Sequence, residues 1–138
     1  MDISRLRQQS NQFIANMDGW IELAVMSNAD SLVGLNIKQM LSSKLANDGA
    51  ITPKYSKAYA KRKGFSDPNL RLKGDFQNDM DISVTKNKYS ITSLDYKTPF
   101  LTKRYTEKIF GIAPSNQSEA QRLNDEKLAS LYLKWLER

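Results

Sequence analysis

Apolar residues in the first part of the chain recur at alternating spacings of three and four positions. That spacing places them along one face of an α-helix. Asp2 is expected to cap this helix, and Gly19, which weakens a helix by about 1 kcal/mol relative to Ala, marks a position where we expect a bend. The face consists of Ile3, Leu6, Ser10, Phe13, Met17, Trp20 and Ala24.

A second apolar set follows between residues 32 and 45. It either continues the first helix or begins another one after the polar stretch 27–31. The N-terminal block, residues 2–47, is therefore predicted to be one bent helix or a helix pair. Gly49 is expected to end the block in a left-handed C-cap, a conformation that glycine adopts without steric penalty.

The middle of the chain, residues 50–80, predicts loops and one short helix that Pro53 opens and Gly64 ends. Apolar and polar residues then alternate on both sides of Asn87-Lys88. This alternation predicts a β-hairpin over about residues 82–94, within the segment 81–95. The alternating apolar positions are Ile82, Val84, Tyr89 and Ile91.

The C-terminal block, residues 99–138, predicts two further helices. A short one runs from Pro99 to Tyr105, and a long one begins at a capping box with Ser118 as N-cap and Gln121 at the N3 position. Together these elements predict a single domain of the α+β class, in which helices at both ends flank a small antiparallel sheet.

The 138-residue chain contains no cysteine and no histidine. Disulfides and thiolate metal sites are thereby excluded, and a serine nucleophile would lack its commonest general base. We therefore expect no enzyme, no cofactor and no metal site. The sequence predicts neither a secretory signal nor a membrane-spanning segment, so we expect the chain in a cytoplasm.

The positive charge of the chain is concentrated between residues 54 and 73. This segment holds seven cations and one carboxylate, an excess of six that equals the formal net charge of the whole chain, +6. Tyr55, Tyr59 and Phe65 lie among the cations. The cations are Lys54, Lys57, Lys61, Arg62, Lys63, Arg71 and Lys73.

Two interpretations of this basic segment stay open. Cations with interleaved aromatic side chains suit contacts with the phosphates and bases of nucleic acid. A solvated surface, or one that complements an acidic protein neighbour, has the same composition, and no recognised nucleic-acid motif accompanies the charge. The nearby carboxylates Asp75, Asp79 and Asp81 are of the type that binds magnesium. No second cluster matches them, so we expect a capping and surface role.

Residues 52–76 carry a resemblance to a known family. Residues 53–64 read Pro-Lys-Tyr-Ser-Lys-Ala-Tyr-Ala-Lys-Arg-Lys-Gly, and residues 68–76 read Pro-Asn-Leu-Arg-Leu-Lys-Gly-Asp-Phe. They resemble the signature Tyr-Ser…Tyr-Ala-Lys…Lys-Gly…Leu-x-x-Thr-Gly-x-Leu/Phe-x-x-Ser of the tail-completion, or virion-morphogenesis, proteins of tailed bacteriophages. Lys73 stands where the signature has Thr, and Asp79 stands near its Ser. Asp75 is then the candidate to cap the short helix expected after Gly74.

The resemblance extends to the order of elements: a long N-terminal helix, the signature, a hairpin, an aromatic-Gly pair (here Phe110-Gly111) and a C-terminal helix. It implies a structural protein of the virion, assembled in the host cytoplasm, that completes the head–tail joint as a ring of identical subunits around the DNA channel. The implied partners are further copies of the chain and the portal, adaptor or tail proteins, with non-specific contact to DNA.

Two functional hypotheses result. The first is a ring-forming neck protein, and the second is a small nucleic-acid-binding protein that acts through the basic segment. Under the first, apolar helix faces and aromatic residues supply subunit contacts as well as core. The residues expected at subunit interfaces are Phe13, Met17, Trp20, Tyr55, Tyr59 and Phe65.

Overall fold

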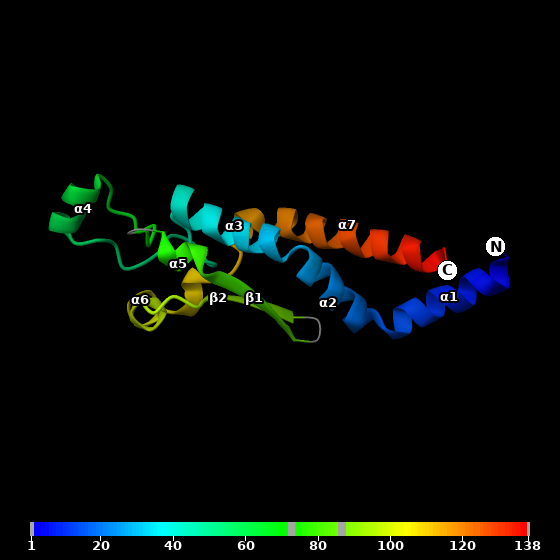
Figure 1. Cartoon of the computed structure of the whole chain (residues 1–138). Coiled ribbons are helices and arrows are strands. Elements are labelled where there is room, and N and C mark those ends of the chain that lie inside the picture. The colour runs from blue at the N-terminus through cyan, green and yellow to red at the C-terminus, as the bar shows by residue number, and fades with distance from the viewer. Residues whose placement is uncertain (1, 72–73, 86–87, 138) are drawn as a thin grey trace.

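The computed structural model describes residues 2–71, 74–85 and 88–137 of the chain. Within these ranges, seven α-helices and one two-stranded antiparallel sheet form the α+β fold that the sequence predicts. The molecule is elongated: helix α4 (Lys57–Lys63) lies at one end, and both ends of the chain lie at the other (Figure 1).

The N-terminal block contains three helices, where the sequence predicted one or two. They are α1 (Ile3–Ala15), α2 (Met17–Ser27) and α3 (Ala29–Ser42). Asp2 caps α1 as predicted, because its side chain accepts a hydrogen bond from the Arg5 amide at 2.7 Å.

The breaks between these helices fall at two asparagines, so the bend expected at Gly19 is wrong. Asn16 leaves the helical conformation with φ −111° and ψ 26°, and its side chain donates to the Gln12 carbonyl at 2.9 Å. The side chain of Asn28 donates to the Leu123 carbonyl at 2.9 Å. Asparagine side chains compete for backbone hydrogen bonds and therefore favour helix ends.

Helix α3 ends at Ser42, before the predicted end of the block at residue 47. Lys44 follows with a left-handed φ of 55°, and Leu45 forms an isolated antiparallel bridge with Ala50. Gly49, with φ 147°, lies in the turn that this bridge closes. The prediction that Gly49 caps a helix is wrong, because the backbone between residues 45 and 50 pairs with itself.

The predicted hairpin is present as β1 (Met80–Thr85) and β2 (Lys88–Ser93). The register pairs Ile82 with Ile91, and both side chains are buried in the core beneath α2 and α3. The predicted turn residue Lys88 instead begins β2 and pairs with Thr85, whereas Asn87 lies outside the described residues.

Helix α7 (Gln117–Leu136) runs back along α2 and α1 to the N-terminal end of the molecule (Figure 1). The ring of Phe13 stacks on Trp20 at a centroid distance of 4.7 Å, and Tyr132 meets Phe13 edge-on at 5.0 Å. Trp135 lies edge-on to Trp20 at 5.6 Å. The apolar face predicted for the first helix therefore packs against α7 around Phe13 and Trp20, whereas Ile3 at its start is 76% exposed.

The predicted capping box at Ser118 and Gln121 is wrong. A 3-10 turn, η2 (Pro114–Asn116), leads directly into α7, which begins at Gln117. Asn116 therefore occupies the N-cap position, and Ser118 lies inside the first turn of the helix.

Two buried amides of α3 hold the segment 109–113, which follows the 3-10 turn η1 (Glu107–Ile109). Asn36 accepts a hydrogen bond from the Gly111 amide at 2.8 Å and donates to the Ile109 carbonyl at 3.2 Å. Gln39 donates to the Gly111 carbonyl and accepts from the Ala113 amide, both at 2.8 Å. These bonds satisfy buried polar groups and fix the segment on the core.

Candidate functional site

The basic segment forms an arm, residues 54–71, at the α4 end of the molecule (Figure 1). Helix α4 begins at Lys57 and not at the predicted Pro53, because the Ser56 hydroxyl caps it by accepting the Tyr59 amide at 3.3 Å. Gly64 follows α4 with a left-handed φ of 88°, a conformation that favours glycine, so the predicted end of this helix is confirmed.

Three aromatic side chains pack together inside the arm. The ring centroids of Tyr55 and Tyr59 are 4.8 Å apart, and those of Tyr55 and Phe65 are 6.2 Å apart. The Nζ atom of Lys63 lies 5.6–5.9 Å from all three centroids and donates a hydrogen bond to the Arg71 carbonyl. Lys63 therefore holds the arm together by cation–π and hydrogen-bond contacts.

Tyr55 joins the two chain segments that form the base of the arm. Its amide donates to the Ser66 carbonyl at 2.9 Å, and its hydroxyl oxygen accepts the Asn69 amide at 3.3 Å. Burial raises the pKa of the Tyr55 phenol above its ordinary value of 10.0, and the Asn69 donor opposes this only in part. The Tyr55 phenol is therefore neutral at pH 7, and its hydrogen bonds fix it at the base of the arm.

A groove of about 460 Å³ opens between the arm and α6 (Thr98–Tyr105). Its apolar surface comes from Leu70, Phe76, Leu101 and Tyr105, with Tyr55 and Tyr59 on the arm side. Four cationic side chains and one carboxylate also line it, which gives an excess of three positive charges. These charged residues are Arg62, Arg71, Lys97, Arg104 and Asp75.

Two of the three arginines of the groove lie against aromatic rings, and no described carboxylate neutralises any of the three. Arg62 lies 5.3 Å from the ring centroid of Tyr59, and Arg104 lies 5.5 Å from that of Tyr105. Within the described ranges, neither these two nor Arg71 forms an ion pair with a carboxylate. Their charge is therefore available to a ligand or a partner.

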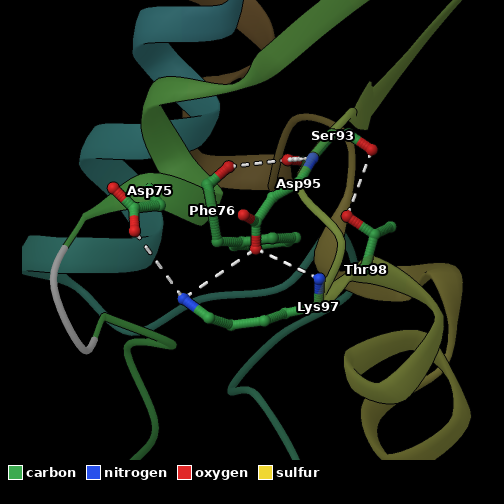
Figure 2. Close-up of polar contacts among 6 residues, drawn as sticks. All are labelled: Asp75, Phe76, Ser93, Asp95, Lys97 and Thr98. Carbon is green, nitrogen blue, oxygen red and sulfur yellow. Dashed lines mark hydrogen bonds and ion pairs between the residues drawn. The ribbon is translucent and has the colours of Figure 1, made fainter.

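Lys97 is fixed by a network that joins three elements (Figure 2). Its Nζ atom lies 4.0 Å from carboxylate oxygens of both Asp75, at the start of α5 (Asp75–Asn78), and the buried Asp95. The Ser93 hydroxyl donates to the Phe76 carbonyl at 2.8 Å, and the Thr98 hydroxyl donates to the Ser93 carbonyl at 3.1 Å. This network ties β2 and α6 to α5, and so sets the wall of the groove opposite the arm.

The structure divides the predicted basic residues into separate groups. Arg62 and Arg71 line the groove. Lys57 and Lys61 are exposed on α4 and do not line it, and Lys54 lies 3.9 Å from Asp67. Lys73 lies outside the described residues.

Of the predicted interface residues, those of the arm and those of the first helix have different surroundings. Tyr55 and Tyr59 line the groove, and Phe65 packs beneath Lys44 at 4.1 Å. Phe13 is 3% exposed, because α7 and Trp20 cover it within the same chain. Met17 is half-buried beside α7.

Sequence reasoning missed the contribution of α6 to the site. Lys97, Leu101 and Arg104 of this region line the groove, although they lie far from the arm in sequence. The one signal for them was the recurrence of Lys97, Leu101 and Arg104 at intervals of four and three residues, which puts them on one helical face.

The three aspartates weighed for magnesium are dispersed in the fold. Asp75 interacts with Lys97, and an Asp81 side-chain oxygen accepts the Ile82 amide at 2.8 Å. Asp75 does not cap α5, since Gly74 occupies the N-cap position. Among the residues described, no group of three acidic side chains is placed to hold a metal ion.

Comparison with protein-family models, with curated proteins and with solved structures finds no match for this chain. None of the helices in the described part of the chain combines the length and the apolar character needed to cross a membrane.

Proposed function

We propose that this chain is a structural protein of a tailed-phage virion, which completes the head–tail joint as a ring of identical subunits around the DNA channel. The proposal begins from the resemblance that residues 52–76 carry. It is supported by the form of the matching segment, which is an arm with its own aromatic packing at one end of an elongated molecule (Figure 1).

The observation that carries the proposal is the surface around the arm and α6. Leu94, Tyr96 and Phe100 are 78%, 76% and 72% exposed, directly before and within α6. The groove on α6 adds arginines that lack a carboxylate partner among the described residues. Exposed large apolar side chains and arginines without a carboxylate partner are both typical of surfaces that bind another macromolecule.

The mass of the purified protein in solution tests this proposal. Light scattering is expected to give a discrete multiple of the 15.8 kDa chain mass, without added DNA. Phage particles assembled without the protein are expected to accumulate separate heads and tails. A chain that stays monomeric at all concentrations, together with heads that join tails in its absence, would exclude the proposal.

Nucleic-acid binding is a second candidate, favoured by the four cations and three tyrosines on one groove. It predicts that a short DNA duplex binds the monomer with an affinity that falls steeply with salt, since each phosphate contact releases counterions. The same light-scattering measurement with duplex present distinguishes the candidates. A mass that changes only with DNA favours this second function, and an affinity that does not depend on salt excludes it.

A further inference from the structure

The outer face of α2 carries charge opposite to that of the groove. Asp18 and Glu22 lie one helical turn apart and are exposed, and Leu23 and Met26 beside them are 52% and 49% exposed. No lysine or arginine occurs between residues 7 and 38, so this stretch of chain offers no cation to offset the carboxylates. We call these four residues the α2 acidic face.

No lysine or arginine in the described ranges neutralises the α2 acidic face. Among the described residues, neither Asp18 nor Glu22 has an ion-pair partner. Carboxylates of α7 differ in this respect, because Arg122 binds Glu119 at 2.6 Å and Glu126 at 2.8 Å. Helix α2 therefore presents both acidic and apolar side chains that nothing within the described chain covers.

The groove offers the complementary set of groups. Its apolar surface, including Leu70 and Leu101, suits aliphatic side chains such as Leu23 and Met26. Arg62 and Arg104 at the same groove lack carboxylate partners among the described residues. Opposed charges around apolar contacts fix the register of two surfaces and speed their encounter.

The two surfaces lie in different parts of the molecule. The groove is at the arm end, whereas α2 lies between the sheet and the chain termini (Figure 1). A contact between two different surfaces of identical chains is heterologous, and it generates a ring when the rotation between neighbours closes. The separation therefore suits one copy joining the next, with both surfaces of every copy used.

We infer that the groove of one copy binds the α2 acidic face of the next copy. This inference rests on the ring-forming function proposed above and names the two surfaces that meet. Arg62 and Arg104 bind Asp18 and Glu22 of the neighbour, and Leu23 and Met26 of the neighbour enter the groove.

Charge reversal on either surface, and on both, tests the inference. The groove variant carries Arg62→Glu and Arg104→Glu, and the α2 variant carries Asp18→Lys and Glu22→Lys. A third chain carries all four substitutions and keeps the net charge of the wild type. The matched control carries Lys57→Glu and Lys61→Glu, which change the net charge as the groove variant does but lie outside the groove. Circular dichroism establishes that each variant is folded.

Light scattering is expected to show that reversal of charge on one surface weakens association and that reversal on both surfaces restores it. The groove variant and the α2 variant each associate at least about tenfold more weakly than the wild type, because like charges then face each other. An equal mixture of the two associates again, since each contact between one variant and the other is between opposite charges. The chain with four substitutions assembles alone, and the control assembles as the wild type does.

Each failure has a separate meaning. A wild-type chain that is monomeric at every concentration overturns this inference, and the proposed function also falls if heads join tails in the absence of the protein. A wild-type ring that the groove variant also forms overturns the inference alone, as does a folded four-substitution chain that stays monomeric. A groove variant that loses only DNA binding, with its ring intact, shows instead that the groove binds nucleic acid.

Discussion

The side-chain amides of Asn36 and Gln39 on helix α3 form hydrogen bonds with the backbone of the segment 109–113. Both side chains are almost completely buried, at 0% and 2% exposed, and together they pair with backbone groups of Ile109, Gly111 and Ala113. Removal of either amide would leave buried backbone groups unpaired, which typically costs about 1–3 kcal/mol. In the sequence these two residues look like ordinary polar positions of a surface helix.

Gly111 is the residue at which this arrangement is least tolerant of change. Its φ is 111°, and a Cβ atom there would lie 3.3 Å from the Cβ of Asn47. We predict that Gly111→Ala lowers the free energy of unfolding by about 1–3 kcal/mol, as measured by urea denaturation.

Gly34→Ala is the matched control for Gly111→Ala. Gly34 lies inside α3, and a Cβ atom there would meet nothing within 4 Å. This substitution is expected to stabilise the protein by about 0.5–1 kcal/mol, because Ala loses less conformational entropy in a helix. Equal stability of the Gly111→Ala variant and the wild type would show that neither the positive φ of residue 111 nor its closeness to Asn47 requires a glycine.

Tyr55 makes the stability of the protein depend on alkaline pH. Because burial raises its pKa in the folded state, folding favours the neutral phenol. Its contribution is complete below the unfolded pKa of 10.0 and is lost as the pH rises through the higher folded value. We predict that, as the pH rises above 10, Tyr55→Phe loses less free energy of unfolding than the wild type. Urea denaturation at a series of pH values measures this difference.

Titration of the tyrosinate absorbance is the companion measurement, and the Tyr89 phenol, whose pKa burial also raises, is the reference. The Tyr55→Phe spectrum is expected to lack one late-titrating group. At neutral pH the variant loses the hydrogen bond to the Asn69 amide, worth about 0.5–1.5 kcal/mol. An unchanged alkaline loss of stability would show that Tyr55 is not the group responsible.

At the scale of elements, α7 is the helix that holds α1 and α2 to the body of the protein. The Trp135 indole donates to the Gln9 carbonyl at 2.9 Å, and the hydroxyls of Ser10 and Tyr132 are 2.7 Å apart. Together with the stacked Phe13 and Trp20, these contacts join the first helices of the chain to the last. They explain how two separate helices, which meet at an angle (Figure 1), both stay packed against α7.

Phe13→Ala is predicted to lower the free energy of unfolding by about 3–5 kcal/mol, because a buried aromatic ring would leave a cavity between α1 and α7. Ile14→Ala, one position along and 62% exposed, is the control and is expected to change stability by less than about 0.5 kcal/mol. Urea denaturation followed by circular dichroism compares the two. Equal effects would mean that Phe13 does not belong to the core.

The existence of most helices and strands could be predicted from the sequence, but several of their first and last residues could not. The periodicity predicted the first helix face, the existence of the hairpin and the final helix, but not the register that pairs Ile82 with Ile91. The break at Asn28 depends on its hydrogen bond to the Leu123 carbonyl in α7, a partner that no local pattern contains. Likewise, the end of α3 depends on the later pairing of Leu45 with Ala50.

At the scale of the whole molecule, elongation separates surfaces that a compact domain would bring together. The arm and α6, which line the groove, lie at one end of the molecule, and α2 lies nearer the termini (Figure 1). Among the described residues, Arg62 and Arg104 at the groove and Asp18 and Glu22 on α2 have no ion-pair partner. Within one molecule these surfaces do not meet. The proposed ring contact between copies would bring the charges together without any change of fold.

Local periodicity and composition were enough to predict the α+β class, the apolar face of the first helix and the concentration of positive charge in residues 54–73. Tertiary structure alone decided which of those cations share a groove. Arg62 and Arg71 meet Lys97 and Arg104 there only because the Lys97 network and the base of the arm bring distant segments together. Lys63, which the sequence could not distinguish from its neighbours, is instead used to hold the arm's aromatic rings.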